Sequence, residues 1–152
     1  MDQGLEQRLT ELGYDTGRAT DISAGKACKR IAGIFGKDDS FAPGMVLFEG
    51  YTKLTVSVGG EQRVLETDLL AVTHGEGGLL LSCLDKGGES IRLSGEDEKG
   101  IYLPFIDSRS YFYERVVMEF IRLAPGDKES NTMAKIDLRP GEDTVIRYLP
   151  DL

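Results

Sequence analysis

Residues 52–94 read TKLTVSVGGEQRVLETDLLAVTHGEGGLLLSCLDKGGESIRLS, and this stretch decides the fold class. At its start Leu54, Val56 and Val58 alternate with polar residues, which is the period of two of a half-buried strand. Glycine-containing turn signals follow at short intervals, at residues 59–60, 75–78 and 85–88. Because a parallel crossover needs about a dozen residues or more, connections this short allow only antiparallel neighbours. The stretch therefore predicts an antiparallel meander of about four strands.

Two helices are predicted ahead of this meander. Residues 2–13 form the first, capped by Asp2, and its docking face carries three leucines, Leu5, Leu9 and Leu12. The second begins at a cap on Asp21 or Ser23, runs to about Phe35 and stops at Gly36. Together they make residues 1–36 a helical N-terminal segment.

Residues 107–123 fit two structures. As a helix, the segment spaces Arg115, Glu119 and Arg122 along one exposed line. As a strand, its aromatic and β-branched residues are equally suitable. The helix is our prediction, because the charges fall at helical spacing. Beyond it, residues 133–138 and 144–149 predict a final hairpin around a proline–glycine turn.

The predicted fold is a single α+β domain spanning residues 1–152 and built mainly of antiparallel β structure. We expect a curled meander or small barrel of about six to eight strands, formed by a β-rich body at residues 45–152. Two N-terminal helices and one helix near residues 107–123 complete it. A meander followed by an amphipathic helix is also compatible with the topology of a pleckstrin-homology-like (PH-like) barrel, although a fold does not determine a function.

The composition of the chain indicates which kinds of partner it can bind and in which cellular compartment we expect it. A net charge of −8 and a pI near 4.7 argue against general binding of nucleic acid or anionic membranes. No apolar run approaches the length of a membrane span, and the N-terminus lacks a signal pattern, so we expect a cytoplasmic chain. Cys28 and Cys83 are predicted to be buried free thiols, and one histidine leaves no ligand set for a metal or cofactor.

The candidate functional residues are few. Lys26, Lys29 and Arg30 fall on the exposed side of the second helix and, with Arg18, form a candidate site for a nucleotide or other anion. Tyr111 and Tyr113 belong to an aromatic cluster and are candidate anchors of a protein interface.

His74, the only histidine, opens the turn at residues 75–78. It has no nucleophile or carboxylate at a recognisable spacing, so no catalytic residue is predicted and a role in the turn is preferred.

The segment Asp21-Ile22-Ser23-Ala24-Gly25, with a proline–glycine pair at 43–44 and a meander downstream, resembles the PilZ domain, a bacterial receptor for cyclic di-GMP. In that family an Asp/Asn-x-Ser-x-x-Gly motif on the barrel acts with an Arg-x-x-x-Arg motif that grips the phosphates. This chain departs from both motifs. Gly25 comes one residue early, and leucine and isoleucine stand four residues after Arg8 and Arg18. The resemblance implies a degenerate PilZ-like sensor, and the departures weigh against the family's own mode of binding.

These observations lead to three functional hypotheses. The leading one is a non-enzymatic cytoplasmic adaptor that acts through protein–protein interaction, with self-association into a homo-oligomer as one expected form. The first alternative is a ligand-sensing β-barrel for a nucleotide or other anion. The second is a small enzyme that uses His74.

Overall fold

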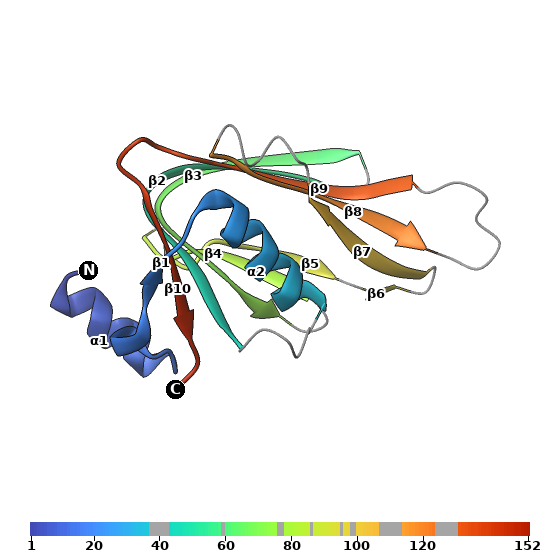
Figure 1. The fold of residues 1–152 in the computed structure, drawn as a ribbon. Coiled ribbons are helices and arrows are strands. Elements are labelled where there is room, and N and C mark those ends of the chain that lie inside the picture. Colours follow the sequence, from blue (N-terminus) through green and yellow to red (C-terminus); the bar gives the residue numbers. More distant parts are fainter. Residues whose placement is uncertain are drawn as a thin grey trace.

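The computed structural model describes residues 1–36, 43–58, 60–75, 78–85, 87–94, 96–97, 100–106, 114–123 and 131–152. In this part of the chain one antiparallel sheet curls around helix α2 (Ala24–Gly36), and helix α1 (Gln3–Glu11) packs on the outside (Figure 1). A short 3₁₀ helix, η1 (Thr16–Arg18), connects α1 to the first strand. The predicted mixture of mainly antiparallel β structure with two N-terminal helices is confirmed.

The sheet has ten strands: β1 (Thr20–Asp21), β2 (Gly44–Val58), β3 (Glu61–Gly75), β4 (Gly78–Cys83), β5 (Ser90–Ser94), β6 (Glu96–Asp97), β7 (Gly100–Ile106), β8 (Val116–Leu123), β9 (Asn131–Pro140) and β10 (Val145–Pro150). Eight of them follow the path β5-β4-β3-β2-β9-β8-β7-β6, while β10 pairs with β2 and carries β1. The meander predicted from residues 52–94 is the run β2 to β5. No pairing between the described strands joins β5 to β6, so a curled sheet is observed and the small barrel is not confirmed.

Strand β2 is the centre of the sheet and serves two groups of strands. Before Gly50 it pairs with β10, and after an irregularity in its register it pairs with β9. We call the strands around the first part of β2 the proximal half-sheet (β1, β10, β4, β5) and those around the second part the distal half-sheet (β9, β8, β7, β6). Strand β3 runs alongside β2 through both halves.

A tight corner at Gly50 separates the two halves. Gly50 has φ +127°, and a side chain there would come within 2.9 Å of Thr144 Cα, so only glycine fits. Thr144 Oγ1 donates to the carbonyl of Tyr51 (2.5 Å) and accepts from the N–H of Gly141 (3.1 Å). The predicted final hairpin is therefore wrong: β9 and β10 do not pair with each other but take consecutive places along the same edge of β2.

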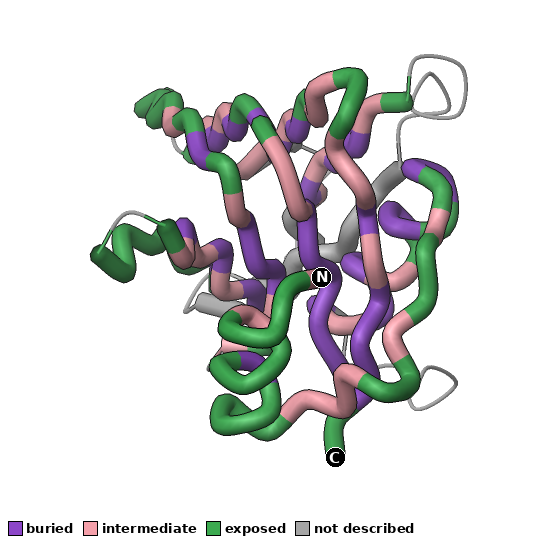
Figure 2. Tube along the Cα trace, turned by 90° about the vertical axis from the view of Figure 1, so that its left-hand side faces the viewer, coloured by how far each residue is buried: buried purple, intermediate pink, exposed green. Residues whose placement is uncertain are grey.

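The inner face of the curled sheet forms the main core with α2. Ser23 Oγ accepts from the N–H of Lys26 (3.2 Å), which confirms Ser23 as the cap of this helix. The rings of Phe35 on α2 and Phe120 on β8 lie 4.6 Å apart. Cys28 and Cys83 are both buried in this core and are not joined by a disulfide, as predicted. Buried positions accordingly follow the middles of the strands in Figure 2.

A smaller core lies on the outer face of the proximal half-sheet, under α1. Asp2 caps this helix by accepting from the N–H of Leu5 (2.7 Å), and Gly13 follows the helix with φ +100°. Leu9 is fully buried against the sheet. Leu12 is 56% exposed, so its predicted place on the docking face is wrong.

The helix predicted near residues 107–123 is wrong for its second half, which is strand β8. Val116, Met118 and Phe120 alternate into the main core with a period of two. The aromatic and β-branched residues of this segment suit a strand, and pairing with β7 and β9 decides in its favour. Residues 107–113, with Tyr111 and Tyr113, lie outside the described residues.

None of the helices that the structure describes is both long enough and apolar enough to cross a membrane.

Candidate functional site

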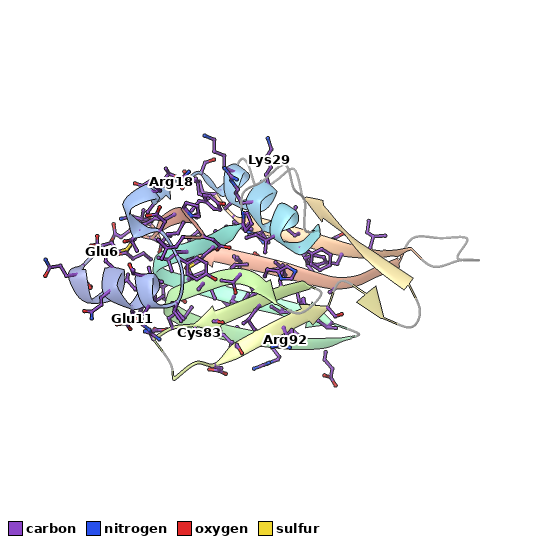
Figure 3. The ribbon with its side chains drawn as sticks, turned by 90° about the horizontal axis from the view of Figure 1, so that it is seen from below. Glu6, Glu11, Arg18, Lys29, Cys83 and Arg92 are labelled. Atoms are coloured by element: carbon purple, nitrogen blue, oxygen red, sulfur yellow. The ribbon has the colours of Figure 1, made fainter. Side chains whose placement is uncertain are left out.

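The four basic residues predicted as a ligand site lie on α2 and η1, and we call them the basic face: Arg18, Lys26, Lys29 and Arg30. Lys26 and Lys29 are exposed, and Arg30 is partly exposed one position further along the same side of the helix. Arg18 is the last residue of η1 and is also exposed. Figure 3 places Arg18 and Lys29 on one side of the molecule, at the top of the view, with Arg92 at the bottom.

Tyr148 on β10 connects two members of the basic face. Tyr148 is buried, with 6% of the residue exposed, and the guanidinium carbon of Arg30 lies 4.2 Å from the ring centroid in a cation–π contact. Burial raises the pKa of the Tyr148 hydroxyl, with Arg30 lowering it, Asp151 raising it and Arg18 lowering it. Both arginines therefore lie close enough to Tyr148 to influence its ionisation, and η1 and α2 both contact β10, the strand of Tyr148.

The other predicted candidate, His74, is exposed on β3 and has Leu79 as its partner on β4. It lies in the strand, directly before the turn that it was predicted to open. Among the described residues no group of three or more His, Cys, Asp or Glu side chains could hold a metal ion.

A groove of about 630 Å³ lies where the start of α2 meets the corner between β9 and β10. We call it the corner groove; its lining is residues 21–25, 114–115, 139–142 and 144–146. The five residues 21–25 are the segment singled out in the sequence, whereas the lining includes no residue of the basic face. The chain thus has a recessed site and a separate convex basic surface, which share helix α2.

Two arginines of the corner groove are held by one carboxylate. Arg115 Nη2 lies 2.6 Å from Asp137 Oδ2, and Arg139 Nη2 lies 3.3 Å from the same oxygen. Asp21, which also lines the groove, is paired with Arg147 at 2.7 Å, and Arg147 also binds Glu49 at 3.0 Å. The first group therefore has two guanidinium groups for one carboxylate, whereas in the second group two carboxylates, Asp21 and Glu49, share the one guanidinium group of Arg147.

Sequence reasoning missed the corner groove because its parts are distant in the chain. The one local signal is the spacing of Asp137 and Arg139, since residues two apart on a strand point to the same side. Arg115 was read as part of a helix, and nothing in the sequence indicated that the residue before β8 would approach Asp137 on β9.

Comparisons of the chain with protein-family models, with curated proteins and with solved structures found no match.

Proposed function

We propose that the chain is a non-enzymatic binding module that recognises an acidic segment of a partner protein through the basic face. The observation that carries the proposal is the gathering of four cationic side chains on one side of α2 and η1, in a chain whose net charge is −8. Electrostatic attraction at a surface acts over about one Debye length, roughly 8 Å at physiological salt. The charges close to this face, rather than the net charge of the whole chain, therefore decide what approaches it.

The shape of the basic face favours a polypeptide over a small molecule. Small-molecule sites are concave, and the corner groove, the recess nearest the start of α2, contains none of the four basic residues. Cations at successive turns of a helix instead present a row of charges to an extended acidic chain. Arg30 is positioned by its contact with the Tyr148 ring, which lowers the entropy lost when it binds a carboxylate.

The test is binding of a fluorescein-labelled glutamate-rich peptide, followed by anisotropy. We expect binding that weakens when NaCl is raised from about 50 to 300 mM, because the contacts are screened charges. Lys26→Glu should weaken it about tenfold, the loss expected when one charge-assisted contact becomes a repulsion. The helix should survive this change, since glutamate three residues after a serine cap is favourable.

Lys53→Glu is the matched control. Lys53 is an exposed lysine on β2, outside the basic face, and the substitution changes the net charge by the same amount. We expect it to leave peptide binding nearly unchanged. Equal losses in the two variants, or no binding at low salt, would contradict the proposal.

A further inference from the structure

The corner groove has the chemistry of a small-molecule site that is separate from the basic face. Its volume of about 630 Å³ falls within the range of roughly 300–1,000 Å³ that is usual for ligand pockets. It is lined by charged side chains from β9 and from the residues before β8, and by the first turn of α2. What it can bind follows from how these groups are paired.

The two arginines are oriented but not neutralised. The side chain of Asp137 is only 13% exposed, and its Oδ2 forms ion pairs with both Arg115 and Arg139. Among the described residues, Asp137 Oδ1 and Arg115 Nε are buried without a hydrogen-bond partner, so the pairing is not the two-bond fork that satisfies both groups. Arg115 remains 32% exposed and Arg139 57% exposed. Donors of both guanidinium groups are thus left for an oxyanion in the groove.

The start of α2 adds further donors beside the arginine pair. Residues 23–25 line the groove, and N–H groups in the first turn of a helix have no partner within the helix. Gly25 itself adds no side chain here, and both Ala24 and Gly25 are buried. The carboxylate of Asp21, which lies at the same end, is held by Arg147 and so opposes an anion less than a free carboxylate would.

Two exposed acids restrict the charge of the ligand. Glu114 and Glu142 also line the groove, so that with Asp21 its lining has three carboxylates and two guanidinium groups. They repel a compound with several phosphates but accept hydrogen bonds from hydroxyl groups. The groove therefore fits one oxyanion next to neutral donors.

We infer that the corner groove binds a small hydroxylated molecule with a single oxyanion group, the chemistry of a sugar monophosphate or a sugar acid. The oxyanion lies against Arg115, Arg139 and the first turn of α2, and the hydroxyl groups lie toward Glu142. Preorganisation by Asp137 reduces the cost of bringing two arginines together.

The experiment is a titration of the ¹⁵N-labelled protein with glucose 6-phosphate, gluconate or glucose, followed by amide chemical shifts. The two charged probes separate a phosphate site from a carboxylate site, and glucose shows what the hydroxyl groups contribute alone. We expect saturable shifts at Ala24, Gly25 and Gly141 with at least one charged probe, and binding of glucose about tenfold weaker or more.

Two variants of matched exposure test the arginine pair. Arg139→Gln should weaken binding of the charged probe about tenfold, because one charge-assisted contact is lost. Arg63→Gln should leave the affinity unchanged; Arg63 is 53% exposed and pairs with Glu89 at 3.8 Å, away from the groove. The amide spectrum of each free variant shows whether the fold is retained.

The inference is overturned by absence of saturable shifts at millimolar probe, by equal losses in the two variants, or by shifts confined to Lys26, Lys29 and Arg30. The last result would place small anions on the basic face. Failure of peptide binding at the basic face would leave the groove inference intact, since the peptide and the sugars are tested on different residues.

Discussion

Tyr148 is both tightly packed against the backbone and in contact with a charged side chain. Gly44 lies so close to it that an added Cβ would come within 2.9 Å of the ring and would also meet the carbonyl oxygen of Leu149. The ring is therefore enclosed by backbone on one side and by the guanidinium group of Arg30 on another. Burial of this phenol disfavours its ionisation.

We predict that the free energy of unfolding falls as pH rises through the alkaline range. Burial raises the pKa of both Tyr14 and Tyr148 above the ordinary value of 10.0. Above that pH the folded state keeps phenol protons that the unfolded state releases, so stability is complete below it and is lost above it. Urea unfolding between about pH 9 and pH 11 measures the slope.

Tyr148→Phe isolates the contribution of one ring from other groups that titrate in this range. The variant should lose stability less steeply with rising pH than the wild type, because phenylalanine has no proton to release. Parallel pH profiles for the two proteins would show that Tyr148 does not contribute.

At the scale of elements, α1 is attached through few side chains. Leu9 is its only fully buried residue, and Leu12, one turn later, is mostly exposed. Leu9→Ala should lower the free energy of unfolding by about 2–4 kcal/mol, because it empties a filled site between α1 and the sheet. Leu12→Ala should change it by no more than about 0.5 kcal/mol. Urea denaturation of both variants measures the difference, and similar costs for the two would refute this packing.

Local patterns predicted the elements whose signals are local. Strands β2 to β5 follow from alternation and turn residues, and α2 follows from its serine cap and inward face. The segment that contains strand β8 was predicted as a helix because its charged residues fall at helical spacing, whereas its pairing with β7 and β9 makes it a strand. The places of β9 and β10 depend on the corner at Gly50, which long-range pairing creates.

The same limit applies to the candidate sites. The basic face was predictable because Lys26, Lys29 and Arg30 are neighbours on one helix. The corner groove was not, because Arg115 and Arg139 meet residues 21–25 only after the sheet has curled. A site whose residues lie on one helix can be predicted from their spacing in the sequence, whereas a site built from three separate segments cannot.

At the scale of the whole molecule, both half-sheets share β2 and β3 and should unfold together. Leu54 is fully buried in the distal half and Leu70 in the proximal half, both in the main core. We predict that Leu54→Ala and Leu70→Ala each lower the stability by about 2–5 kcal/mol while leaving one transition. Circular dichroism and amide signals from either half, followed through urea unfolding, should coincide in both variants. Separate midpoints for the two halves would contradict this coupling.

The two-sided pairing of β2 also has a consequence for the order of events during synthesis. One edge of β2 pairs with β3, which the ribosome delivers immediately afterwards, but the other edge awaits β9 and β10. At about 5–20 residues per second that wait lasts several seconds. Throughout it, the nascent chain presents an open edge next to Val46, Phe48 and Leu54, the kind of edge that other chains can pair with. The central strand of the sheet is thus among the first to be made and the last to gain all its partners.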